Sequence, residues 1–418
     1  MPLDVTALRA LFPALDRTQD GRPVAYFDGP AGTQAPQSVA DAVSGCLLHH
    51  NANSGAPFAT SHEADAILDA GRSAMADLLG AGDPDEIAFG PNMTTLTLAA
   101  SRALAQTWQR GDEIIVSRLD HDANVTPWVL AAQDAGAIVK HVDVNRADCT
   151  LDLASFEAAL SERTRLVAVG LASNAVGTIN PVRDIAARAT EVGAISWIDA
   201  VHYGPHGLID VEEIGCDFLV CSAYKFFGPH VGILWGRREL LESIRPYKLR
   251  PSPEELPGRW MTGTQNHEGI AGVTAAVEYL ARVGDLAQET ESSMAPSPRR
   301  ERLRHSFSLI AAHEQELGRR LIAGLQQLPN VTIWGIADPQ RSNERVPTVS
   351  ITHATQTPQE IASKLADRGL WVWAGNHYAL PLTEALGLEP HGTLRIGLVH
   401  YNTAEEVDRL LGVLAEIV

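Results

Sequence analysis

The chain has 418 residues, of which 45% are hydrophobic and 20% are charged, and its formal net charge is −18. This composition is typical of an ordinary globular protein with a substantial core, and the length favours two domains. The strong negative charge argues against nucleic acid or an anionic membrane as a main partner.

The cysteines give no metal-binding pattern. The chain has four of them, at Cys46, Cys149, Cys216 and Cys221. None forms a Cys-x-x-Cys pair, so we expect no metal site, and sparse cysteines are typical of a reducing compartment. The first residues lack a basic region followed by an apolar run, and no apolar run approaches the roughly 18 residues of a membrane-spanning helix. We therefore expect a cytoplasmic protein.

The first 80 residues predict mainly helices. Residues 1–24 favour a short helix and a linker, and the segment after Tyr26 is a strand that runs into a Gly/Pro turn. A helix at 36–49, a turn-rich loop at 51–60 and an amphipathic helix at 61–79 follow.

A regular alternation of strands and helices begins at residue 86. The predicted strands cover residues 86–89, 113–117, 138–144, 165–172, 194–199, 217–221 and 231–235. The helices among them cover residues 92–108, 127–135, 153–160 and 181–192. This pattern predicts an α/β fold with a mostly parallel sheet covered on both faces. Ligands of such sheets bind outside the carboxyl ends of the strands.

The pattern changes after residue 236. The predicted helices cover residues 270–283, 301–328, 358–368 and 404–417, and the predicted strands cover residues 331–334, 348–352, 370–373 and 393–399. This mixture indicates a smaller α+β C-terminal domain. We expect a large domain at 26–285, a small domain at 286–418, and an N-terminal segment, 1–25, that packs with the small domain.

Lys225 is the most informative single residue. It follows the short apolar strand at 217–221 and enters a Gly-Pro turn, in a chain with only four lysines. A buried ammonium group is costly unless it has a partner or a covalent bond. Alone, the position fits a lysine whose stem packs while its head reaches water; in a suitable setting it fits a Schiff-base lysine.

Other polar residues also stand at predicted strand ends or helix starts. Thr94 and Thr95 open a helix and could bind a phosphate, although simple N-capping by the preceding Asn92 is the alternative. Asp199 ends a strand, where it could cap a turn or pair with a protonated ring nitrogen. His202 could be a loop histidine or a donor to a cofactor oxygen.

Two further residues complete a possible cofactor site. His121 could be paired with its acidic neighbours or could stack on an aromatic ligand. Arg395 lies in the apolar run TLRIGLV and needs an anionic partner, either a substrate carboxylate or a structural acid. The whole set suits pyridoxal 5′-phosphate (PLP) better than other common cofactors, and no Gly-x-Gly-x-x-Gly supports NAD.

The sequence resembles the class V aminotransferase superfamily of fold-type I PLP enzymes, and within it the cysteine desulfurase and selenocysteine lyase group. The resemblance runs from RALFP at 9–13 and YFD at 26–28 to YNTAEEVD at 401–408. It implies a seven-stranded, mostly parallel sheet in the large domain. By resemblance, Lys225 is the Schiff-base lysine, Asp199 pairs with the pyridine nitrogen and His202 contacts the phenolic oxygen. His121 then stacks on the ring, and Asn174 lies near substrate and cofactor.

The resemblance also implies how phosphate and substrate are held. Thr94, Thr95 and Ser222 match phosphate ligands, and Thr264 matches the ligand lent by a second subunit. A homodimer with composite sites is therefore implied. Arg395 matches the arginine that binds the substrate carboxylate.

The chain departs from this group at several positions. Tyr378 stands where desulfurases carry their catalytic cysteine, and Trp373 replaces an arginine of the same stretch. Tyr224 replaces the histidine before the lysine. Asn53 and Ser54 replace the His-Arg of an early Asn-x-His-Arg-Gly motif, and we expect Asn53 to bind substrate together with Asn174 and Trp373.

Three functions follow from these observations. The first is a lyase that removes a sulfur, selenium or other substituent from an L-amino acid without a protein persulfide, with Tyr378 or His377 as proton donor. The second is an aminotransferase or epimerase with a larger substrate. The third is a protein that binds the cofactor without catalysis, which the presence of Lys225, Asp199 and Arg395 opposes.

Overall fold

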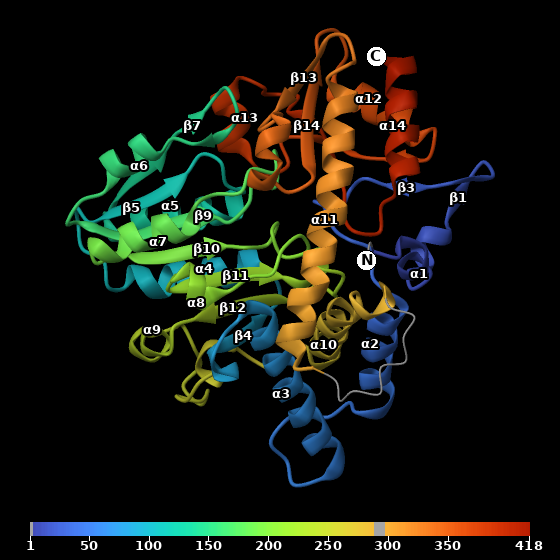
Figure 1. Ribbon diagram of the computed structural model, residues 1–418. Helices are drawn as coiled ribbons and strands as arrows, with labels where there is room; N and C mark the ends of the chain where they lie inside the picture. The colour runs from blue at the N-terminus through green and yellow to red at the C-terminus, as the bar shows by residue number, and fades with distance from the viewer. Residues whose placement is uncertain (1–2, 288–296) are drawn as a thin grey trace.

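A seven-stranded sheet forms the middle layer of the larger part of the molecule in this computed structural model, which describes residues 3–287 and 297–418 (Figure 1). The strand order is β4-β12-β11-β10-β9-β5-β6. The strands are β4 (Ile87–Gly90), β5 (Glu113–Ser117), β6 (Ile138–Val142), β9 (Thr164–Gly170), β10 (Ile195–Asp199), β11 (Phe218–Ser222) and β12 (Gly232–Gly236). Only the pairs of β12 with β11 and β4 are antiparallel. The predicted fold class, a mostly parallel seven-stranded sheet in an α/β protein, is confirmed.

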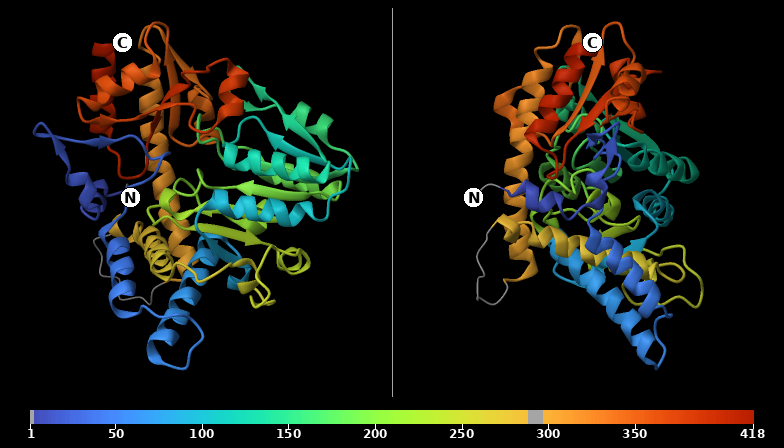
Figure 2. Two further views of the ribbon diagram at one scale, coloured as in Figure 1. Left: turned by 180° about the vertical axis from the view of Figure 1, so that it is seen from behind. Right: turned by 90° about the vertical axis from the view of Figure 1, so that its right-hand side faces the viewer.

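Helices cover both faces of this sheet (Figure 2). Side chains alternate between the faces along each strand, so Ile114 and Val116 join one buried cluster while Ile115 joins the other. The first cluster includes side chains of α4 (Met93–Ala105), α5 (Thr126–Ala135) and α9 (Arg238–Ser243). The second includes side chains of α3 (Ala59–Leu79), α6 (Leu153–Ala159), α7 (Val182–Glu191) and α10 (His267–Arg282).

A four-stranded antiparallel sheet forms the C-terminal part. Its order is β13 (Val331–Trp334), β14 (Thr348–His353), β17 (Thr393–Gly397) and β16 (Trp373–Gly375). It packs against α12 (Pro358–Ala366), α14 (Ala404–Ile417) and the second half of α11 (Arg299–Leu325). With 27 residues, α11 is about 40 Å long and contributes to the cores of both parts. Figures 1 and 2 show it running alongside both parts of the molecule.

The element boundaries differ from the sequence prediction in a few places. The strand predicted at 370–373 is split at Val372, because β15 (Leu370–Trp371) pairs with β3 (Ala25–Tyr26) while β16 pairs with β17. Three short helices were not predicted, namely α8 (Val211–Ile214), α9 and α13 (Leu380–Leu386). The remaining elements are α1 (Val5–Arg9), α2 (Gln37–His49), β1 (Thr18–Gln19), β2 (Arg22–Pro23), β7 (Val144–Asn145) and β8 (Thr150–Leu151). Among the described residues, no helix combines the length and apolar character that crossing a membrane requires.

Candidate active site

A cavity opens at the carboxyl ends of β9, β10 and β11, beside the N-terminus of α4. This is the edge at which open α/β sheets bind their ligands. Seven residues singled out from the sequence line it: Thr94, His121, Asn174, Asp199, His202, Ser222 and Lys225. The strand topology therefore brings together side chains that lie up to 131 positions apart, from Thr94 to Lys225.

Lys225 ends the short turn that follows β11 and is only 9% exposed. Its Nζ donates hydrogen bonds to the carbonyl oxygens of Pro30 and Ala31, the latter at 3.1 Å. Nζ also lies 4.8 Å from the centre of the Tyr224 ring. Burial, together with the Arg395 guanidinium, lowers the pKa of Lys225 to about 7. A large fraction of this amine is therefore neutral, and nucleophilic, near neutral pH.

Two buried carboxylates stand on the sheet side of the cavity. Asp199, at the end of β10, accepts the Val201 N–H at 2.8 Å, and burial raises its pKa to about 6. Asp120 accepts the Gly170 N–H and the Asn124 amide, both at 2.9 Å, and burial raises its pKa to about 7. Asp120 was not predicted from the sequence as a cavity residue. Asp199 has one oxygen without a protein partner among the described residues, so it can accept a further N–H.

The N-terminus of α4 offers donors for an anion. Asn92 caps this helix by accepting the N–H and hydroxyl of Thr95, at 2.9 and 3.0 Å. The Met93 N–H donates to Ser222 Oγ at 3.0 Å, which leaves the Ser222 hydroxyl proton available to the cavity. Thr94 lines the same space. Free N–H groups and hydroxyls at a helix N-terminus suit a phosphate.

His121 and Tyr378 form a stacked pair at the cavity. Their ring centroids are 5.4 Å apart and the ring planes differ by 13°. His121 Nδ1 accepts the Ala123 N–H at 3.0 Å, so the proton of the neutral ring is on Nε2. Burial lowers the pKa of His121 to about 4, which keeps the ring neutral. Tyr378 is 73% exposed and forms the outer layer of the stack.

Arg395, in β17, is a buried cation that forms no ion pair with any described residue. It is 4% exposed, donates from Nη1 to the Asn174 carbonyl at 2.9 Å, and its Nε has no partner. Burial lowers its pKa to about 9, although the Asp28 carboxylate opposes this shift. Asn174 Oδ1 is also buried without a partner among the described residues, whereas Asn174 Nδ2 donates to the His377 carbonyl at 2.8 Å. An anionic group would satisfy the unpaired guanidinium.

The loop that carries His377 and Tyr378 has a strained backbone. Both residues have positive φ angles, 56° and 57°, which cost energy in residues other than glycine. The Tyr378 carbonyl accepts the Asp122 N–H at 2.7 Å, and His377 Nε2 lies 3.0 Å from Thr393 Oγ1. These contacts, with the Asn174 bond above, hold the loop against the cavity. Such strain is concentrated at functional sites.

Four predicted residues, Thr95, Thr264, Asn53 and Trp373, are absent from the lining of this cavity in the single chain. Thr95 and Thr264 line a different cavity, which they share with Trp260 and Tyr247. Asn53 is exposed in the loop between α2 and α3, and it is absent from the lining of the candidate site. Trp373 is 51% exposed and lies directly opposite Arg395 on the neighbouring strand.

The four cysteines are all buried, at 4% exposure for Cys46, 0% for Cys149 and Cys216 and 1% for Cys221. None of them lines the candidate site. Burial raises the pKa of Cys149 to about 11 and that of Cys216 to about 12, and it raises the pKa of Cys221 further. These thiols are therefore poor nucleophiles.

Comparison with known proteins gives consistent matches over the whole chain. A family model described as aminotransferase class-V matches residues 25–296 and 300–410. A cysteine desulfurase of Pectobacterium carotovorum is 31% identical over 432 residues, which cover 100% of this chain and 98% of that protein. A probable cysteine desulfurase of Mycolicibacterium paratuberculosis is 34% identical over 423 residues, which cover 98% of this chain but only 57% of that longer protein. The apo structure of a cysteine desulfurase from Thermococcus onnurineus has a TM-score of 0.87 at 27% identity, and the match covers 100% of this chain and 98% of the other.

Proposed function

Because this chain belongs to the class V aminotransferase family and is a PLP-dependent enzyme, we propose that it is a lyase acting on an L-amino acid. The substrate carries a sulfur, selenium or other leaving group on its β- or γ-carbon. In this proposal the group leaves without forming a persulfide on the protein, which distinguishes the chain from the cysteine desulfurases that it resembles.

The residues of the cavity fit PLP. Asp199 has an oxygen without a partner among the described residues that can accept the ring N–H, and Ser222 and the first turn of α4 have unused donors for the phosphate. Lys225 Nζ would hold the cofactor's carbonyl carbon, and His121 would cover one ring face. When bound, PLP supplies an electron-accepting ring that stabilises negative charge at the substrate's Cα.

Lys225 is the proposed base at Cα. Its lowered pKa, about 7, makes the neutral amine available to take the Cα proton near neutral pH. Asp199, with a pKa near 6, is ionised at the same pH and keeps a proton on any ring nitrogen that it faces. Both groups are buried, so their interactions are weakly screened by water.

Arg395 is the proposed carboxylate-binding residue. Its guanidinium has unused donors, and its Nη1 bond to the Asn174 carbonyl fixes its orientation. Trp373 lies opposite Arg395 across the antiparallel pair of β16 and β17, so the two side chains share one face of the sheet. The indole would therefore limit the space beside the bound carboxylate.

Tyr378 is a better candidate than His377 for protonating the leaving group. His377 Nε2 faces Thr393 Oγ1, and the Thr393 hydroxyl in turn donates to Ser350 at 3.0 Å, so the His377 proton is used in this chain of bonds. Burial and the Arg395 charge lower the pKa of His377 to about 2, so its ring is neutral and holds no second proton to give. The exposed Tyr378 hydroxyl forms no hydrogen bond with the described residues.

The observation that carries the proposal is the position of the cysteines. A persulfide requires a thiolate beside the substrate, and all four thiols are buried away from the cavity with raised pKa values. With L-cysteine as substrate, elimination is balanced as cysteine plus water giving pyruvate, ammonia and hydrogen sulfide. Persulfide formation would instead leave alanine and a sulfur atom on the protein.

Product analysis tests the proposal. The full-length holoenzyme is incubated with a panel of β- and γ-substituted L-amino acids, and the products are identified by mass spectrometry. Keto acid and ammonia in equal amounts, with the freed substituent, support the lyase. Alanine with protein-bound sulfur contradicts it.

An aminotransferase or epimerase with a larger substrate is the second candidate. The observation that favours it is the large aromatic surface exposed at the site, since Trp373 is 51% and Tyr378 73% exposed. Such rings could line a pocket for a bulky side chain. In the same product analysis, amino transfer to a keto acid supports the aminotransferase, and racemised substrate supports the epimerase.

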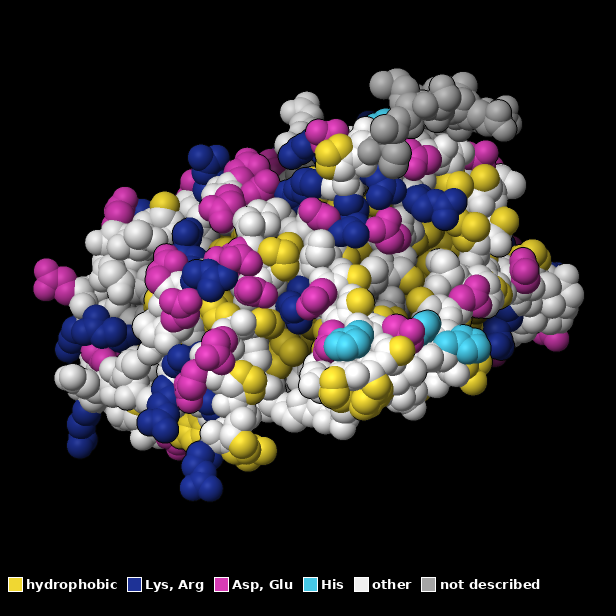
Figure 3. Space-filling model, turned by 90° about the horizontal axis from the view of Figure 1, so that it is seen from below, with side chains coloured by type: hydrophobic (Ala, Val, Ile, Leu, Met, Phe, Trp, Pro, Cys, Tyr) yellow, Lys and Arg dark blue, Asp and Glu magenta, His cyan; other side chains and the backbone are white. Residues whose placement is uncertain are grey.

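A homodimer with composite sites is part of the proposal. Thr264 lies outside the candidate site of its own chain, in a surface region with Tyr247 and Leu249, which are 65% and 66% exposed. Leu48 and Phe58, near the Asn53 loop, are also 72% and 53% exposed. Figure 3 shows hydrophobic and histidine side chains gathered near one end of the face seen from below. Exposed apolar residues of this kind favour an interface, through which Thr264 would reach the site of the partner subunit.

A further inference from the structure

His202 is linked to the C-terminal sheet by one side-chain hydrogen bond. It lies in the loop after β10 and lines the candidate site, whereas Thr348 is the first residue of β14, 146 positions later. His202 Nε2 and Thr348 Oγ1 are 3.0 Å apart. His202 is 4% exposed and Thr348 is fully buried, so water does not compete for this bond.

The His202 ring is neutral. Burial lowers its pKa well below the ordinary value, and the basic side chains of His206, Lys225 and Arg395 lower it further. A neutral imidazole carries one proton, on either Nε2 or Nδ1, and the hydrogen bond of one nitrogen decides the state of the other.

The hydroxyl of Thr348 decides between the two tautomers. Among the described residues, His202 Nε2 is the only hydrogen-bond partner of Thr348 Oγ1. If Nε2 donated its proton to Thr348, the hydroxyl proton would be left buried without an acceptor among the described residues, which is unfavourable. If the hydroxyl donates to Nε2 instead, both groups are satisfied. We propose that Thr348 is a positioning residue that holds His202 as the Nδ1–H tautomer, so that His202 presents a hydrogen-bond donor to the cofactor cavity.

The second ring nitrogen fits this role. His202 Nδ1 has no hydrogen-bond partner within residues 3–287 and 297–418. It is not among the fully buried atoms without a partner, and the residue lines the cavity. A donor at this place suits an anionic oxygen, such as the phenolic oxygen of PLP. The inference thus rests on the proposed function for the identity of the acceptor, whereas the tautomer itself follows from the contacts of this chain.

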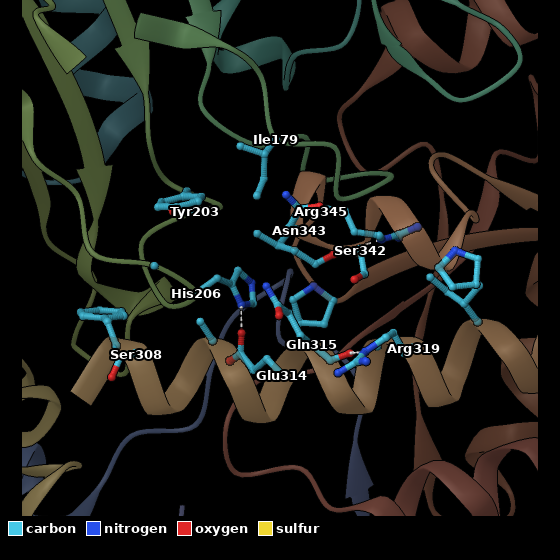
Figure 4. A pocket seen from close by; sticks show the side chains of 18 of the residues that line it. Ile179, Tyr203, His206, Ser308, Glu314, Gln315, Arg319, Ser342, Asn343 and Arg345 are labelled. Atoms are coloured by element: carbon cyan, nitrogen blue, oxygen red, sulfur yellow. Dashed lines mark hydrogen bonds and ion pairs between the residues drawn. The ribbon is translucent and has the colours of Figure 1, made fainter. Parts of the chain in front are cut away.

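A second link to the C-terminal part runs through His206, which packs against the His202 ring and is itself held by Glu314. His206 packs edge-on against His202, with centroids 5.4 Å apart and an interplanar angle of 70°. His206 Nδ1 in turn pairs with Glu314 Oε2 of α11 at 2.7 Å, and both side chains are at most 3% exposed. Figure 4 shows His206 and Glu314 pointing toward one another and joined by a dashed line, among the side chains that line a second cavity. The donor at His202 is therefore fixed by contacts from β14 and α11, and it requires the C-terminal part to be seated on the large sheet.

Three variants of the full chain test this inference. T348V keeps the shape of the side chain and removes the hydroxyl, whereas T348S keeps the hydroxyl. S350A, two residues along the same strand, removes a buried hydroxyl that donates to the Ala175 carbonyl, accepts from Thr393 and forms no hydrogen bond with His202. The tautomer is read from two-bond ¹H–¹⁵N correlations of ¹⁵N-histidine-labelled protein without cofactor, and the His202 signal is assigned by its loss in H202Q. The dissociation constant of PLP is measured in parallel.

Wild type, T348S and S350A are expected to show the Nδ1–H pattern for His202, and T348V to show a mixture or the Nε2–H pattern. The dissociation constant of PLP is expected to rise about fivefold in T348V only, as for one lost hydrogen bond. An Nε2–H ring in the wild type, or a T348V spectrum and affinity equal to those of the wild type, overturns the inference. Either result leaves the proposed reaction intact, because that is tested by products; failure of the lyase assay would likewise leave the tautomer result standing.

Discussion

Tyr378 covers one face of the His121 ring, with ring centroids 5.4 Å apart and planes 13° from parallel. The backbone reinforces this contact, because the Tyr378 carbonyl accepts the N–H of Asp122, the residue after His121. We propose that Tyr378 takes the position of the catalytic cysteine of the desulfurases. In this proposal a phenol replaces a thiol beside His121.

Tyr378 variants separate the ring from the hydroxyl. Y378F keeps the stack and loses the proposed proton donor, so kcat for substrates with poor leaving groups should fall about 100-fold. Y378A also loses the stack, worth about 1 kcal/mol, and should bind PLP more weakly as well. Steady-state kinetics and cofactor titration check both. A Y378F enzyme with wild-type kcat would show that the hydroxyl is not the donor.

Arg395 and Arg345 are both buried arginines, so Arg345 provides the control for Arg395. Arg345 is bonded to four main-chain carbonyls, including those of Val176 and Thr348, so four of its five N–H donors are already used. R395K should lower kcat/KM about 50-fold through a raised KM, since a charged two-point contact is lost. R345K should lower the melting temperature and leave KM unchanged. The assignment of the carboxylate site is wrong if R345K, rather than R395K, raises KM.

The buried Lys225 predicts a pH dependence of stability in the cofactor-free protein. The unfolded chain keeps the lysine proton up to its ordinary pKa of 10.5, whereas the folded protein releases it near pH 7. Between these values the unfolded state binds more protons, so stability rises with pH. Below about pH 7 Lys225 is charged in the folded protein as well, so the unfolding free energy is lowered by the full cost of burying this charge.

The variant K225M removes this cost. It should be more stable than wild type at about pH 6, and the difference in unfolding free energy should shrink steadily toward about pH 10. The exposed Lys364 provides the control, because K364M should show no such trend. Urea titrations across this range give the measurement. A constant difference between K225M and wild type would mean that Lys225 is not the buried, lowered amine described here.

The composite dimer predicts complementation between two defective subunits. K225A should be inactive, and T264A should need more PLP for full activity. In a mixed dimer the site with the wild-type Lys225 receives the wild-type Thr264 of the other chain, so half of the sites are restored. Mixing the two variants should therefore recover activity at low PLP concentration. Mass measurement first shows that the mixture contains mixed dimers. If the activity at low PLP concentration is still not recovered, the proposed role of Thr264 is contradicted.

Much of the candidate site could be predicted because strand ends in an α/β sheet converge. Asp199 and Lys225 each follow a short apolar strand, so their position along the chain already placed them at one edge of the sheet. The sequence left two partners open for Arg395, a structural acid or a substrate carboxylate. The structure favours the substrate carboxylate, because the guanidinium forms no ion pair with the described residues.

Other parts of the site carry no signal in the sequence. Pro30 and Ala31 contribute only main-chain carbonyls to Lys225, about 195 positions away, which no side-chain pattern could indicate. Thr348 is one hydroxyl at the start of an apolar strand, and its importance lies in the partner, His202, that the domain arrangement brings to it. The sequence could also not place Thr264, because its proposed role depends on a second chain.

The central claim is that the substituent leaves without a protein persulfide, and intact-protein mass spectrometry during turnover of L-cysteine tests it most directly. We predict that the protein mass shows no added sulfur, that pyruvate and sulfide form together, and that replacing all four cysteines by alanine leaves the rate of pyruvate formation per folded holoenzyme within about twofold of wild type. A sulfur adduct on Cys46, Cys149, Cys216 or Cys221 that forms and decays at the rate of turnover, with alanine as the product, would contradict the account.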